Sequence, residues 1–286
     1  MIWHRLAPRL GRAAVVAGVS ASLLALAAPA AHAAHAAKPG SRPSGPVGYD
    51  ISYPQCRVAY PSGQAFGIVG VNGGLANDAN SCLGSELSWA LASPGMLSPP
   101  QPAGSLYINT ADPGPAPGVT DWPTAGTTAG YGACDGSWSQ ACAYLYGQQR
   151  AQYSYGLVSA ANPSVASVAP WWLDIETTNS WATSTTPNYA GVNIAAIQGF
   201  VAGLHAAGAT AAVGVYSTAS QWSQITGLTA QTTAAAFGGA SPPDWVAGPG
   251  TRKEAQSRCL SGGFTGANPT LGQYSSGGYD ADLRCG

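Results

Sequence analysis

The chain has 286 residues, of which 45% are hydrophobic and 8% charged, and its formal net charge is −1. Lys38 and Lys253 are its only lysines, and no basic cluster occurs, which excludes nucleic acid and anionic membrane surfaces as partners. After residue 37 the only histidine is His205, inside a helical pattern, so its expected role is structural or at the surface. This scarcity of histidine excludes Ser-His-Asp, Cys-His and the usual zinc hydrolase sites.

The first 46 residues have the composition of a targeting segment and a linker. Three arginines precede an alanine-rich apolar run, and small residues offer cleavage positions between Ala33 and Ala37. This pattern predicts a secretory signal peptide over residues 1–37 and a flexible tether over residues 38–46. The apolar run is too short for a good membrane span. We therefore expect a secreted or cell-wall-associated monomer without membrane contact after cleavage, with a single domain over residues 47–286.

All six cysteines lie in the part that would be exported: Cys56, Cys82, Cys134, Cys142, Cys259 and Cys285. An even count in an exported chain indicates disulfides. Fifteen pairings are possible, and we favour the sequential ones, Cys56–Cys82, Cys134–Cys142 and Cys259–Cys285. Metal ligation is the alternative, but no C-x-x-C spacing supports it, and we expect neither a metal nor a cofactor.

Eight segments have strand composition, and helical patterns follow several of them. The expected strands are 47–52, 65–71, 105–109, 171–176, 211–217, 244–248, 271–276 and 279–284. The expected helices are 81–93, 137–161, 188–207, a short one around Trp222, and 252–259. Alternating βα units with eight strands predict an α/β fold of closed, TIM-like barrel type, irregular at its end. A doubly wound open sheet is the alternative, but no phosphate-binding G-x-G-x-x-G follows a strand. The loop over residues 110–136 is unusually long for a compact domain.

The stretch Trp171-Trp-Leu-Asp-Ile-Glu176 sets two carboxylates into an apolar strand. Because alternate strand residues share a face, Trp172, Asp174 and Glu176 would point to one side. Paired carboxylates at a strand end are typical of a glycosidase site. The alternative is that both acids lie on a solvated strand end or form structural ion pairs.

Other acids fall at positions that a closed barrel would bring near this strand. Asp50 ends the first strand, and Asp280 and Asp282 alternate on the last. The carboxyl ends of barrel strands form one face, and that face carries the active site. We therefore predict one acidic site, although each acid could instead cap a loop or pair with Arg57 or Arg284. The 9 tryptophans and 13 tyrosines suit sugar binding, since a pocket is typically apolar with few polar groups.

Several motifs, in order along the chain, resemble the family 25 glycoside hydrolases, the Chalaropsis-type lysozymes. They are Gly48-Tyr-Asp-Ile-Ser-Tyr-Pro-Gln55, Phe66-Gly-Ile-Val-Gly-Val71, Leu173-Asp-Ile-Glu176, Val215-Tyr-Ser217, Asp244-Trp-Val-Ala247, Gln273-Tyr-Ser-Ser276 and Ala281-Asp-Leu283. The resemblance spans nearly the whole chain after the tether. It departs from the family at Gly73, where the family usually carries an acid, and at Gly272, where a tryptophan is common.

The resemblance implies a (βα)5β3 barrel that cuts the β-1,4 bond after N-acetylmuramic acid in peptidoglycan. Glu176 would be the general acid/base, Asp174 would orient the acetamido group or stabilise the developing cation, and Asp50 and Asp282 would line the same floor. We expect substrate-binding roles for Asp280, Trp172, Tyr216, Gln273, Tyr274 and Asn72. Two alternatives stay open: a non-catalytic barrel that binds cell-wall carbohydrate, and a secreted adhesion domain with a protein partner.

Overall fold

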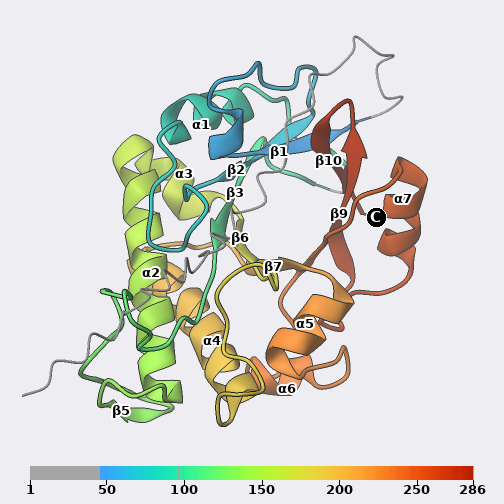
Figure 1. The fold of residues 1–286 in the computed structure, drawn as a ribbon. Helices are drawn as coiled ribbons and strands as arrows, with labels where there is room; N and C mark the ends of the chain where they lie inside the picture. Colours follow the sequence, from blue (N-terminus) through green and yellow to red (C-terminus); the bar gives the residue numbers. More distant parts are fainter. Residues whose placement is uncertain (1–45, 96, 99, 286) are drawn as a thin grey trace, which may run out of the picture. The chain divides into compact units, whose positions relative to one another are not determined.

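The computed structural model describes residues 46–95, 97–98 and 100–285. The predicted signal peptide (1–37) and nearly all of the predicted tether (38–46) lie outside these residues. Within the described part, eight strands close into a barrel in the order β1-β10-β9-β8-β7-β6-β3-β2 (Figure 1). They are β1 Gly48–Ile51, β2 Phe66–Gly70, β3 Gly104–Asn109, β6 Trp171–Asp174, β7 Val213–Ser217, β8 Asp244–Val246, β9 Pro269–Ser276 and β10 Tyr279–Arg284.

The strand pairing confirms the predicted irregular barrel. Neighbouring strands are parallel from β1 round to β9, whereas β10 is antiparallel to both β9 and β1. The chain can place β10 this way because Gly277 and Gly278, both at positive φ, form a tight hairpin after β9. Pairing of β1 with β10 closes the barrel, so the first and last predicted strands lie side by side.

Helices lie outside the barrel strands (Figure 1). They are η1 Tyr53–Gln55, α1 Leu83–Leu91, α2 Gln140–Ala161, α3 Pro163–Val168, α4 Tyr189–Ala207, α5 Ala219–Thr226, α6 Thr233–Ala236 and α7 Arg252–Leu260. The five predicted helices correspond to α1, α2, α4, α5 and α7, while α3 and α6 were not predicted, because each is too short to show a period. The long loop over residues 110–136 contains an unpredicted antiparallel hairpin, β4 Gly126–Thr128 with β5 Gly132–Cys134.

The two longest helices, α2 and α4, pack along each other at glycines. A Cβ on Gly147 would collide with the backbone of Ala196, and a Cβ on Gly199 would collide with the backbone of Tyr144. Among the described residues, α4 is the one helix long and apolar enough to cross a membrane, with half of its apolar window buried. Its buried face against α2 is that of a core helix.

His205 lies near the C-terminal end of α4 and is exposed, as the predicted surface role requires. Its Nδ1 lies 2.9 Å from the carbonyl oxygen of Ala209.

The three predicted disulfides are present: Cys56–Cys82, Cys134–Cys142 and Cys259–Cys285. The first joins the segment after β1 to the start of α1. The second ties the β4–β5 hairpin to the first turn of α2, and the third joins α7 to the residue after β10. The cross-links therefore fix loops and the closing strand to the helices that cover them.

The apolar residues divide between the inside of the barrel and the layer under the helices. Phe66, Ile68, Trp172, Trp245 and Leu271 form the inner cluster. The outer cluster takes the alternate residues of the same strands, including Val69, Trp171, Leu173 and Ile175. The predicted alternation along β6 is thus confirmed: Trp172 points inward, and its neighbours Trp171 and Leu173 point toward the helices.

Candidate active site

The acidic stretch of β6 ends slightly earlier than predicted. The strand stops at Asp174, and Glu176 lies two residues beyond it, half-buried. The backbone N–H of Ile175 donates to the carbonyl of Tyr216 at 2.9 Å, and the carbonyl of Ile175 accepts from Ser217 Oγ at 2.7 Å, so the backbone continues alongside β7. The carbonyl of Asp174 accepts from Thr110 Oγ1 and Asn179 Nδ2, at 2.5 and 3.1 Å. Asp174 and Glu176 therefore stand on a backbone held from both sides.

A second group of side chains joins β1 to β9 and β7. The amide of Gln273 donates from Nε2 to Asp50 Oδ2, at 3.0 Å. Its Oε1 accepts from the hydroxyl of Tyr216, at 2.8 Å. The chain Tyr216–Gln273–Asp50 thus crosses the inside of the barrel, and it includes three of the residues that the sequence assigned to the site.

Asp282 lies deeper and is fully buried. In the strand register it faces Gly48 of β1 and Gln273 of β9, while Asp280 faces Asp50. The indole of Trp245 donates to Asp282 Oδ1 at 2.8 Å, and the carboxyl of Asp50 lies close to that of Asp282. Burial and the neighbouring carboxylates raise the pKa of both groups. The raised pKa values favour the protonated forms of both carboxyls, so the pair carries less negative charge than two ordinary aspartates would.

Two tyrosine hydroxyls show that the acids converge on one end of the barrel. Burial raises the pKa of Tyr216, and the charges of Glu176, Asp50, Asp174 and Asp280 raise it further. Burial and the charges of Asp50, Asp174 and Glu86 do the same to the pKa of Tyr107. Acids from β1 and the end of β6 therefore act on both hydroxyls, and Asp280 of β10 acts on that of Tyr216, as the strand order predicts.

Asp174 is a buried acid whose carboxyl group is not fully hydrogen-bonded. Its Oδ1 has no hydrogen-bond partner among the described residues. Burial first, and the charge of Glu176 second, raise its pKa well above that of an ordinary aspartate. A raised pKa favours the protonated carboxyl, which can donate a hydrogen bond to a ligand at the mouth of the barrel.

Two of the residues assigned to the site lie elsewhere. Tyr274 faces outward from β9 and packs with Tyr49 and Ala255, because it alternates with the inward Gln273. Asn72 is buried; its Nδ2 donates to Asp78 O and Ser154 Oγ, and its Oδ1 accepts from the backbone N–H of Asn109. The described contacts of Asn72 hold the ends of β2 and β3 together and do not reach the acidic cluster.

Tyr107 and Trp245 lie beside the acidic cluster, although the predicted set of site residues did not include them. Trp245 lies 4.5 Å from Tyr216, centroid to centroid, and edge-on to Tyr107 and Trp172 at 6.1 and 5.9 Å. These four rings form an aromatic wall below the acids. The signal was available in the alternation of Leu106-Tyr107-Ile108, which places one polar aromatic on the inward face of an apolar strand.

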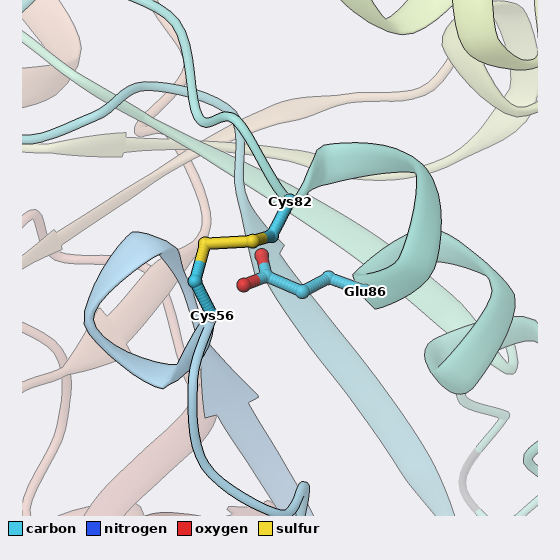
Figure 2. A group of neighbouring side chains, drawn as sticks. All are labelled: Cys56, Cys82 and Glu86. Atoms are coloured by element: carbon cyan, nitrogen blue, oxygen red, sulfur yellow. A yellow bond between two sulfur atoms is a disulfide. The ribbon is translucent and has the colours of Figure 1, made fainter.

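A further acid, Glu86 of α1, lies beside the Cys56–Cys82 disulfide (Figure 2). The sulfurs of these cysteines are bonded to each other and are therefore not thiolate ligands for a metal. Asn80 Nδ2 donates to Glu86 Oε2 at 2.6 Å, and Oε1 has no hydrogen-bond partner in the described part of the chain. Burial raises the pKa of Glu86 to about 7.

Arg284 was considered as an ion-pair partner for the acids. Its described contacts are instead hydrogen bonds, in which its guanidinium donates to the carbonyls of Pro100, Thr270 and Cys285.

Comparison with known proteins identifies one matching family. Residues 139–237 match the family model described as Lysozyme-like protein 1. This segment includes Asp174 and Glu176, so the predicted lysozyme-like resemblance is confirmed over the stretch that carries them. No curated protein matches the sequence.

Solved structures similar to this chain include three of low identity. A bacterial lysozyme from Streptomyces coelicolor is 17% identical with a TM-score of 0.46, over 85% of this chain and 93% of that one. A muramidase from Trichobolus zukalii is 14% identical with a TM-score of 0.46, over 85% and 94%. The modular Cpl-1 endolysin, solved with a peptidoglycan analogue, is 15% identical with a TM-score of 0.42, over 83% of this chain and 53% of that one.

Proposed function

We propose that this protein is an exported glycoside hydrolase that cuts peptidoglycan or a related amino-sugar polysaccharide. The observation that carries the proposal is a connected set of inward residues: Asp174 pairs with Tyr216 in the register of β6 and β7, and Tyr216 is linked through Gln273 to Asp50 by hydrogen bonds. The lysozyme-like match over residues 139–237 supports the choice of substrate. Three disulfides and the signal pattern in the first 37 residues support export.

Glu176 is the general acid in this proposal. Its proton passes to the glycosidic oxygen as the bond from that oxygen to the anomeric carbon breaks, and the bonding electrons stay on the oxygen. The oxygen of a water molecule then bonds to the anomeric carbon, and a proton from that water returns to Glu176. The half-buried position of Glu176, beyond the strand end, lets it reach a polymer at the barrel mouth.

The other acids have supporting roles. The raised pKa of Asp174 favours its protonated form, which donates a hydrogen bond to the acetamido oxygen of the sugar. Asp50, which Gln273 holds by a hydrogen bond, stabilises in its ionised form the positive charge that develops on the sugar ring. The aromatic wall of Tyr107, Trp172, Tyr216 and Trp245 excludes water from this charge and strengthens the interaction.

The test is hydrolysis by a Glu176→Gln variant. We expect release of reducing ends from purified peptidoglycan to fall by about 10²–10⁴-fold, the usual contribution of a general acid. Thermal unfolding should stay nearly unchanged. Glu254→Gln is the matched control, because glutamine preserves the capping box at the start of α7, outside the barrel. If the unaltered protein binds insoluble cell wall saturably but releases no reducing ends, the proposed hydrolase is wrong and a non-catalytic wall-binding barrel is the better description.

A further inference from the structure

A cavity of about 260 Å³ lies directly beyond the acidic stretch of β6. Its walls come from the loop that follows Glu176, from the start of α4 and from α5. The lining residues that matter are Asn179, Trp181, Thr183, Tyr189, Gln224 and Ile225. Nothing in the proposed hydrolysis uses this cavity.

The cavity and the acids form one connected unit. The indole of Trp181 donates to the carbonyl of Glu176 at 2.9 Å, and Asn179 Nδ2 donates to that of Asp174 at 3.1 Å. On the far side, Asn193 Nδ2 donates to the carbonyls of Ala182 and Ile225, at 2.9 and 2.8 Å, and so holds the loop against α5. A ligand in the cavity would therefore sit at a fixed place relative to Glu176.

The lining identifies a class of ligand. Trp181 and Tyr189 supply flat apolar surface, and Thr183, Asn179 and Gln224 supply hydroxyl and amide groups, while no lining residue carries a charge. A neutral ligand with an apolar face and polar edges fits such walls, whereas a charged peptide would lose hydration without gaining a partner. The volume is below the roughly 300–1,000 Å³ of pockets for drug-sized ligands, so it suits a single ring unit.

We propose that this cavity binds one N-acetylated amino-sugar unit, as a site separate from the acidic cluster. This inference rests on the proposed action on an amino-sugar polymer. Side-chain amides match an acetamido group, which offers one N–H donor and one carbonyl acceptor. Gln224 is exposed and makes no hydrogen bond with the described residues, so its amide is available to a ligand.

The probe is tri-N-acetylchitotriose, titrated calorimetrically into the Glu176→Gln variant so that no cleavage intervenes. We expect saturable binding that weakens at least about fivefold when Tyr189→Ala and Gln224→Ala are added together, the size of one lost neutral hydrogen bond. The matched control adds Gln149→Ala and Tyr153→Ala, two exposed side chains of α2, and should bind as before.

Equal affinity of the cavity variant and its control would overturn the inference, as would the absence of saturable binding. If the Tyr189 change prevents folding, Gln224→Ala alone decides, because its side chain is exposed. The two proposals fail separately. If the cavity variant loses binding but the unaltered protein hydrolyses nothing, the sugar site stands and the proposed enzymatic function fails. If the unaltered protein hydrolyses peptidoglycan but the cavity substitutions do not change binding, the enzymatic function stands and the sugar site fails.

Discussion

Gln273 and Asp50 are 223 residues apart in the sequence, yet the amide of one donates to the carboxylate of the other at 3.0 Å. The contact exists because β10 closes the barrel between β9 and β1. The same glutamine accepts from Tyr216, so one side chain orients an acid and an aromatic residue of the site. Replacing Gln273 therefore tests the arrangement of the site without removing any of its acids.

Replacing Gln273 with leucine should impair function more than folding. Leucine has a similar volume, but it cannot donate a hydrogen bond to Asp50 or accept one from Tyr216. The side chains of Asp50 and Tyr216 therefore lose the contact that orients them. We expect hydrolysis of peptidoglycan to fall at least about tenfold, with about 1–3 kcal/mol lost from the free energy of unfolding. Gln101→Leu is the control, since this buried glutamine precedes β3 and donates to Ser105 Oγ at 3.3 Å. A similar loss of activity in both variants would contradict the assigned role.

Glu86 should make stability depend on pH in a way that glutamine does not. Its pKa is raised from 4.5 to about 7 by burial, so between these values only the unfolded chain releases the proton. The free energy of unfolding therefore falls as the pH rises. Relative to the unaltered protein, Glu86→Gln should gain up to about 1.4 kcal/mol per pH unit in this interval and then level off.

Urea unfolding at a series of pH values measures this gain. Glu254→Gln provides the opposite case, because hydrogen bonds from Thr251 lower the pKa of Glu254. Its stability relative to the unaltered protein should decrease slightly as the pH rises through the acidic range. Parallel pH profiles for Glu86→Gln and the unaltered protein would show that the folded state does not favour the protonated carboxyl.

Two glycines of α2 should respond to alanine in opposite directions. A Cβ on Gly147 would collide with the backbone of Ala196, so Gly147→Ala must separate α2 from α4. A Cβ on Gly156 would have nothing within 4 Å. We expect Gly156→Ala to stabilise the protein by up to about 1 kcal/mol, the helix propensity difference.

Gly147→Ala should destabilise the protein by at least about 2 kcal/mol, since overpacking against backbone relaxes poorly. Thermal unfolding of both variants is the measurement. Stabilisation by both substitutions would mean that α2 and α4 do not pack as closely as described.

The disulfides should differ in their contribution to stability according to the loop that each closes. Cys259–Cys285 spans 26 residues and Cys134–Cys142 spans 8. By the chain-entropy estimate, replacing both cysteines with serine should cost about 3.5 kcal/mol for the first pair and about 2.5 kcal/mol for the second. Urea unfolding of the two double variants tests the order, and a larger loss for Cys134–Cys142 would refute it.

Much of the barrel was predictable because its signals are local. The eight strands, five of the helices and the three disulfides follow the prediction, and alternation along β6 placed Trp172 and Asp174 inside. The short helices α3 and α6 and the β4–β5 hairpin escaped prediction, since three to six residues carry no measurable period. Tyr274 was assigned to the site together with Gln273, but consecutive strand residues face opposite sides.

The sequence by itself determined the strands, their order and the face on which each acid stands, because hydrophobic periodicity depends only on nearby residues. Closure of the barrel decided the rest. It brought Gln273 to Asp50 and Trp245 to Asp282, and it buried Asp174 deeply enough to raise its pKa. Burial and contacts between distant strands depend on how the whole chain packs, so no local pattern encodes them.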